Sequence, residues 1–155
     1  MTQRLILVRH GEAVSETVDP QRPLSDAGRQ AVQRVATWVA SAGLTADEAW
    51  HSGKLRAAQT AELIVDAMMP HPPLKAVSGL APNDDIEPIA DSLLDGPDRL
   101  MLVGHLPFLG RLVSRLVIGS ADRPLADFAA GTLVLLDRIE ERWVIRCVIP
   151  PDLLP

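Results

Sequence analysis

Two arginines and two histidines of this sequence have the chemistry needed to handle a phosphoryl group. Arg9 and His10 are adjacent, Arg56 lies further along, and His105 follows Gly104. A guanidinium is planar and always charged, so it matches the oxygens of a phosphoryl group. A neutral imidazole nitrogen is a competent nucleophile toward phosphorus. The four side chains therefore suit phosphoryl transfer, provided that the fold brings them together.

The elements predicted around these residues would bring them to one edge of a sheet. Short apolar runs typical of buried strands cover residues 5–8 and 100–103, and a weaker strand candidate covers residues 46–52. Arg9 and His10 follow the first run, Ser52 and then Arg56 follow the weaker candidate, and His105 follows the run at 100–103. Ligands of open α/β sheets bind at the carboxyl ends of strands, so these groups meet if the strands are neighbours.

Helical patterns alternate with the strands along the whole chain. Helices are predicted over residues 25–40, 55–69, from Asn83 or Asp84 to about 94, and 107–118, and further strands near Val77 and over 132–139 and 143–149. This order predicts one α/β domain over residues 1–155. We expect a three-layer sandwich with a mostly parallel central sheet and an antiparallel C-terminal edge. Residues 150–155 are expected to form a surface extension.

The composition is that of an ordinary globular protein. The net charge of −5 argues against nucleic acid or an anionic membrane as the main partner. No apolar run approaches the roughly 18 residues of a membrane helix. The single cysteine, Cys147, allows no intrachain disulfide and is expected to be buried in a strand. Together these features predict a cytoplasmic protein that binds neither membranes nor nucleic acid. We expect a monomer, because no segment is plainly surplus to the core.

Several segments resemble the signatures of the histidine phosphatase superfamily, also called the phosphoglycerate mutase-like family. The three motifs are LVRHGE at residues 7–12, SGKLRAAQT at 52–60 and VGH at 103–105, and RPLSDAG at 22–28 is similar to the family's stretch before the first helix. The resemblance covers about residues 5–118. The chain looks most like the short SixA-type phosphohistidine phosphatases, because it leaves little room for the long helical insertion of larger members.

The resemblance implies a role for each residue of the predicted constellation. His10 would be the nucleophile, Arg9 and Arg56 would hold the phosphoryl oxygens, and His105 would stabilise their charge. The reaction would pass through phosphohistidine on the enzyme and would need no metal or other cofactor. Water would then release inorganic phosphate.

Three further residues are expected to contact the substrate. The resemblance suggests that Arg22 reaches the anion, Gly11 would allow a ligand to approach the backbone closely, and Leu106 lies beside His105. The residues after the fourth helix, 118–127, could shape one rim of the site. A protein substrate would need such a site to be shallow and open.

The general acid of larger family members has no clear counterpart in this sequence. The candidates are Glu12, Asp84 and Asp85. A phosphate ester leaves as an alkoxide and needs a proton, whereas phosphohistidine leaves as imidazole, whose ordinary pKa is about 6.5. A site without a strong acid therefore favours phosphohistidine in a protein as the substrate.

Other interpretations of the same residues remain open. The first is a phosphomonoesterase for a small phosphorylated metabolite on the same fold, and the second is a non-catalytic phosphate-binding domain. A metal-binding protein that uses all four histidines is less consistent with their spacing, which matches no standard ligand pattern. His51 and His71 are expected to be structural or surface residues.

Overall fold

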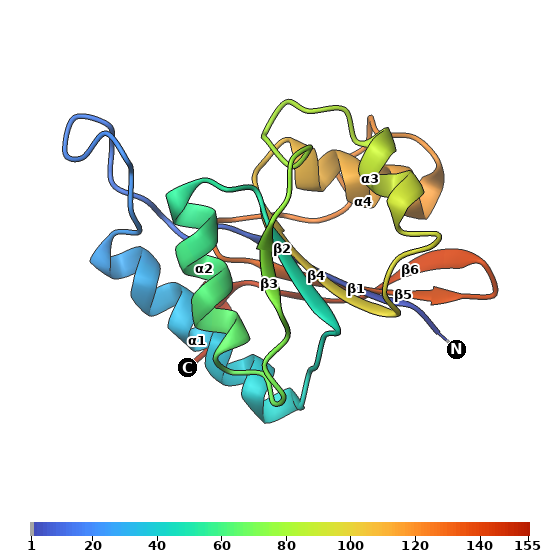
Figure 1. Ribbon diagram of the computed structural model, residues 1–155, viewed down its shortest axis with the longest axis horizontal. Coiled ribbons are helices and arrows are strands. Elements are labelled where there is room, and N and C mark those ends of the chain that lie inside the picture. Colours follow the sequence, from blue (N-terminus) through green and yellow to red (C-terminus); the bar gives the residue numbers. More distant parts are fainter. Residues whose placement is uncertain (1) are drawn as a thin grey trace.

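A six-stranded mixed sheet forms the centre of the chain in a computed structural model, which describes residues 2–155 (Figure 1). The strands are β1 (Arg4–Arg9), β2 (Glu48–His51), β3 (Leu74–Ala76), β4 (Arg99–Gly104), β5 (Leu133–Ile139) and β6 (Arg142–Ile149). The helices are α1 (Asp26–Ala42), α2 (Leu55–Val65), α3 (Glu87–Ser92), α4 (Phe108–Ile118) and the short 3₁₀ helix η1 (Pro151–Leu153).

The order of the strands across the sheet is β3-β2-β4-β1-β5-β6. The first four strands in this order are parallel, and β5 and β6 are antiparallel to their neighbours. The predicted sheet, mostly parallel with an antiparallel C-terminal edge, is therefore confirmed. Its central strand β1 lies between β4 and β5, so the residues that follow β1 are next to those that follow β4.

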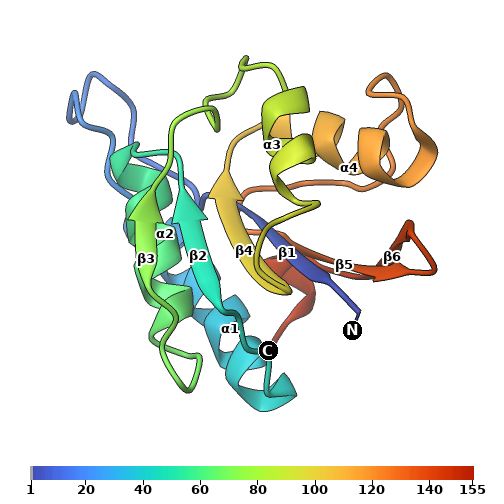
Figure 2. The same cartoon turned by 45° about the vertical axis from the view of Figure 1, so that its right-hand side comes forward.

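The two faces of the sheet are covered by different helices (Figure 2). Successive side chains of a strand point to opposite faces. In β1, Ile6 and Val8 pack in the cluster that includes α1 and α2, whereas Leu5 and Leu7 pack in the cluster that includes α3 and α4. Both sets are buried, which is why this strand reads as a continuous apolar run and why the fold has three layers.

Local hydrogen bonds explain where the helices begin and end. Ser25 caps α1 as predicted, because its Oγ accepts a bond of 3.0 Å from the Gly28 amide. The third helix begins later than predicted, at Glu87. Asp84 and Asp85 each accept a bond from a nearby backbone amide in the turns before it, so their side chains close these turns instead of capping a helix.

Three predictions need correction: the end of α2, the position of the C-terminal residues and the burial of Cys147. The helix α2 ends at Val65 and not at residue 69, because tight turns follow it before Pro70. The C-terminal residues are a surface extension only in part: Asp152, Leu153 and Pro155 are exposed, whereas Pro151 is buried and its carbonyl accepts a bond of 3.3 Å from Arg34 of α1. Cys147 is only partly buried, because β6 is an edge strand.

None of the helices within residues 2–155 combines the length and the apolar character that crossing a membrane requires.

Candidate active site

The carboxyl ends of β1, β2 and β4 meet at one edge of the sheet. Arg9 is the last residue of β1, and His10 and His105 directly follow β1 and β4. Arg9 pairs with Gly104 in the parallel register, so His10 and His105 continue from neighbouring strands. Their ring centroids lie 4.9 Å apart. Arg56 lies in the first turn of α2, just after β2, and its charge acts on both rings. The structure thus brings the four predicted residues together.

One ring nitrogen of His10 has a free lone pair. Its Nδ1 lies 2.7 Å from the Gly11 carbonyl oxygen, which can only accept, so Nδ1 carries the proton. The unprotonated nitrogen is then Nε2. Burial lowers the pKa of His10 to about 4; the Gly11 carbonyl opposes this shift, and the positive charges of Arg56, Arg9 and Arg22 add to it. His10 is therefore neutral at physiological pH, as a nucleophile must be.

His105 is held from one side only. Its ring is buried, and its Nε2 lies 2.6 Å from the Ser52 hydroxyl oxygen. Burial lowers the pKa of His105 to about 3, and the nearby His10, Arg56, Lys54 and Arg9 lower it further. Nδ1 has no protein partner. When Ser52 donates to Nε2, the ring proton is on Nδ1, which is then a free donor at the site.

Both arginines also keep a buried donor free. Arg9 donates from Nη1 to the Phe128 carbonyl at 2.8 Å, but its Nε has no partner, and neither has Nε of Arg56. Within residues 2–155, these two atoms and Nδ1 of His105 are three of the four buried side-chain polar atoms without a partner. Leaving one such group unpaired costs about 1–3 kcal/mol. Three unpaired polar atoms of residues that act on the His10 ring suit an anion with several oxygens.

Comparison with known proteins identifies the family of the chain. The model of the histidine phosphatase superfamily (branch 1) matches residues 5–81. The chain is 33% identical over 139 residues to an uncharacterized protein of Picosynechococcus sp., which covers 84% of this chain and 83% of that protein. It is 27% identical over 139 residues to the phosphohistidine phosphatase SixA of Escherichia coli, which covers 86% of each chain. The chain belongs to the histidine phosphatase superfamily.

The fold of this superfamily member is also that of solved phosphatases. The structure of the protein histidine phosphatase SixA complexed with tungstate superposes with a TM-score of 0.84 and covers 97% of this chain and 98% of that chain, at 22% sequence identity. At this identity the likeness establishes the fold. The predicted phosphoglycerate mutase-like architecture is therefore confirmed, and the chain is a phosphatase of this superfamily with a SixA-like fold.

Two residues of the motif at 52–60 support this phosphatase's site, although the sequence alone assigned neither of them a role. Thr60 accepts a bond of 3.0 Å from the Gly11 amide and donates to the Arg56 carbonyl at 2.8 Å, so it ties the loop after β1 to α2. Gln59 accepts from the Leu24 amide of the same loop at 2.8 Å. Their polar side chains three and four residues after Arg56 were the available signal, because such spacing places groups on one helix face.

Gly11 is required by packing as well as by any ligand. A Cβ atom at Gly11 would lie 2.7 Å from Val32 of α1, and one at Gly28 would lie 2.0 Å from the carbonyl oxygen of Glu12. Glycine at both positions lets the loop after β1 lie directly on the start of α1. The close approach that Gly11 permits in this structure is therefore that of a helix.

Arg22 and Leu106 lie in the walls of different cavities. Arg22 lines a cavity together with Arg56 and adopts a left-handed backbone conformation, with φ of 50°. Its Nε donates to the Val14 carbonyl at 3.0 Å. Leu106 lines a separate cavity together with Arg9. A strained non-glycine backbone held in place at a site is typical of a functional position.

The three candidate acids make local contacts outside the constellation. Glu12 accepts a bond of 3.1 Å from Ser25 at the start of α1, and Asp84 and Asp85 close turns before α3. The charged side chains of residues 2–155 that shift the pKa of His10 are all arginines. A different carboxylate, Glu16, acts on Arg56 and lines the cavity with it.

The remaining histidines take part in local structure. Nδ1 of His51 accepts a bond of 3.0 Å from the Gly53 amide, and Nδ1 of His71 lies 3.0 Å from the Val65 carbonyl oxygen. In the part of the chain that the structure describes, no group of three or more His, Cys, Asp or Glu is arranged to hold a metal ion.

Proposed function

We propose that this phosphatase removes the phosphoryl group from phosphohistidine side chains of a protein and passes through phosphohistidine on His10. The observation that carries the proposal is the pairing of a neutral nucleophile with free donors. Nε2 of His10 has a lone pair at neutral pH, the charges of Arg9 and Arg56 act on its ring, and the ring of His105 lies 4.9 Å away. Nε of both arginines and Nδ1 of His105 have no protein partner, which supports their use as donors to the substrate. Such donors stabilise the charge on the transferring oxygens without reorganising.

The reaction follows in two balanced steps. In the first, the Nε2 lone pair of His10 forms the bond to phosphorus while the P–N bond of the substrate breaks. The substrate ring, whose other nitrogen carries a proton, leaves as neutral imidazole. In the second step, a water oxygen bonds to phosphorus, the P–N electrons return to Nε2, and phosphate leaves with both protons of the water. Throughout both steps, Nδ1 of His10 keeps its proton and donates it in a hydrogen bond to the Gly11 carbonyl oxygen.

The surroundings of His10 support a P–N substrate over a phosphate ester. An alkoxide leaving group needs a strong proton donor close by, whereas imidazole, with an ordinary pKa of about 6.5, does not. The charges that act on His10 from residues 2–155 are positive, and Glu12 is already bonded to Ser25. These contacts favour binding of the anion and provide no evident acid.

The test is a metal-free assay of a phosphohistidine-bearing protein beside a panel of sugar phosphates and nucleotides. We expect hydrolysis of phosphohistidine by the wild type and by His71→Ala, and loss of turnover in His10→Ala. His71 is a matched control because it contacts the Val65 carbonyl away from the site. We also expect EDTA to leave the rate unchanged. The phosphorylated intermediate should be trapped on His10 by rapid quenching and located by mass spectrometry.

Each alternative outcome has a definite meaning. Faster turnover of an ester than of phosphohistidine would keep His10 but assign a metabolite as the substrate. Bound phosphate without turnover of either class would favour a non-catalytic phosphate-binding domain. Substantial activity in purified His10→Ala would refute the nucleophile.

A further inference from the structure

A second cavity, of about 580 Å³, opens beside Arg9. It lies between the start of α4 and the segment formed by residues 121–129. Most of its lining is apolar and includes Leu106, Pro107, Ala121, Pro124, Ala126, Phe128 and Ala129. Charged residues also line it, namely Arg111, Asp122, Arg123 and Asp127 in addition to Arg9. This volume is within the range of sites that bind small organic groups, and the lining favours an apolar occupant. The phosphoryl transfer described above uses none of these apolar side chains.

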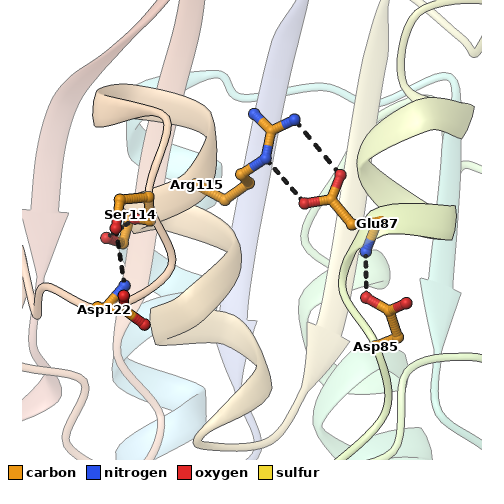
Figure 3. A network of polar contacts seen from close by, with 6 residues as sticks. Asp85, Glu87, Ser114, Arg115 and Asp122 are labelled. Atoms are coloured by element: carbon orange, nitrogen blue, oxygen red, sulfur yellow. Dashed lines mark hydrogen bonds and ion pairs between the residues drawn. The ribbon is translucent and has the colours of Figure 1, made fainter.

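The segment of residues 121–129, which forms one wall of this cavity, is held by hydrogen bonds at both of its ends. At one end, the buried Ser114 of α4 donates to the Ser120 carbonyl and accepts a bond of 3.2 Å from the Arg123 amide. Figure 3 shows Ser114 beside Asp122 of this segment. At the other end, the Phe128 side chain is buried and its carbonyl accepts the bond from Arg9. The wall is therefore held in place before a substrate arrives.

The helix α4, which forms the other wall of the cavity, is also held by an ion pair. Arg115 of α4 donates two bonds, of 2.8 and 3.3 Å, to the carboxylate of Glu87 in α3 (Figure 3). Both side chains are partly exposed, so the pair contributes little stability. Its geometry nevertheless joins the two helices that cover this face of the sheet.

We propose that this cavity binds the apolar side chain of a residue close to the phosphohistidine in a polypeptide substrate. The inference rests on the proposed function. Arg9 belongs both to the cavity and to the phosphoryl site, so the occupant is part of the molecule that carries the phosphoryl group. A polypeptide presents aliphatic side chains near its phosphorylated residue, whereas a sugar phosphate presents hydroxyl groups. Leu125, which lies in the sequence between the lining residues Pro124 and Ala126, is 36% exposed.

Gly110 of α4 provides a way to fill the cavity without disturbing the fold. It lines the cavity, and a Cβ atom there would meet only Leu106, at an ordinary contact distance of 3.7 Å. Leucine is also a better helix former than glycine. Gly110→Leu should therefore fold and occupy the space. Ala40→Leu is the matched control, because Ala40 is an exposed residue of α1 on the other face of the sheet.

The experiment compares two phosphohistidine peptides that differ only in having leucine or alanine at the positions flanking the phosphohistidine. For the wild type and Ala40→Leu, we expect kcat/KM to be about tenfold higher for the leucine peptide, mainly through a lower KM, because leucine removes more apolar surface from water in the cavity than alanine does. For Gly110→Leu we expect the ratio to fall to about one. Ala126→Leu, on the opposite wall, should lower the ratio in the same way.

The outcomes separate this inference from the proposed function. Equal turnover of both peptides by the wild type would overturn the apolar subsite and leave phosphohistidine hydrolysis intact. A preference that survives in both Gly110→Leu and Ala126→Leu, with folding verified by circular dichroism, would also overturn it. Failure to hydrolyse either peptide, with esters still turned over, would refute the proposed function and the subsite with it.

Discussion

Lowering the pH from 7 to 5 is expected to leave His10 largely neutral and able to attack phosphorus. With a pKa of about 4, about 90% of His10 is neutral at pH 5, whereas an ordinary value of 6.5 would leave about 3% neutral. The difference in available nucleophile is about thirtyfold. It arises mainly because the folded protein removes the ring from water and so disfavours its charged form.

The assay is a titration of the histidine ring signals by nuclear magnetic resonance, with the His10 signal assigned by comparison with His10→Gln. The titration is performed without phosphate, because an anion among the free donors would stabilise the charged ring. The rate of phosphorylation of His10, measured by rapid quenching, should fall at acidic pH with a midpoint near the pKa of about 4. A midpoint for His10 between pH 6 and 7 would refute the reasoning that burial keeps the nucleophile neutral.

A bound anion provides the complementary measurement. Inorganic phosphate or tungstate near His10 and His105 should raise the pKa of both rings, because a nearby negative charge favours the charged form. The shift should be upward from the values of about 4 and about 3. Unchanged titration curves at saturating anion would contradict the location of the anion beside these rings.

Two further substitutions test the positioning of the site. Ser52→Ala leaves Nε2 of the buried His105 without a partner. We expect kcat/KM, measured by steady-state kinetics, to fall about fivefold or more, because the ring loses the contact that fixes its orientation and tautomer. A change of less than twofold would contradict this role. Gly28→Ala places a Cβ atom 2.0 Å from the Glu12 carbonyl oxygen and should lower the free energy of unfolding by about 1–3 kcal/mol or more in urea titrations. Gly110→Ala, with room for its Cβ, is the control that should cause no loss.

The parts of the fold that follow from local patterns were predictable from the sequence. The apolar runs of β1 and β4 and the Ser25 cap of α1 depend on neighbouring residues alone. The later start of α3 was not predictable, because Asp84, one of the two predicted caps, could equally close a turn, as it does. The packing of Pro151 on α1 was missed for a related reason: it depends on residues more than a hundred positions away.

Some features of the candidate site were likewise predictable from the sequence, and others depend on the fold. Its residue types and their positions after strands are properties of the sequence, as are the motifs that relate it to the superfamily. The strand order that makes His10 and His105 neighbours is a property of the fold, and so is the bond from Arg9 to Phe128 across 119 positions.

By itself, the sequence determined which functional groups this protein has and which sheet edge would present them, because strand patterns and motif spacing are local. Only the tertiary structure decided how those groups behave. Burial lowers the pKa of His10, the Gly11 carbonyl selects its tautomer, and packing leaves Nε of Arg9 and of Arg56 without a partner. The physical reason is that solvation and hydrogen bonding depend on everything packed around an atom, and most of those neighbours are distant in the chain.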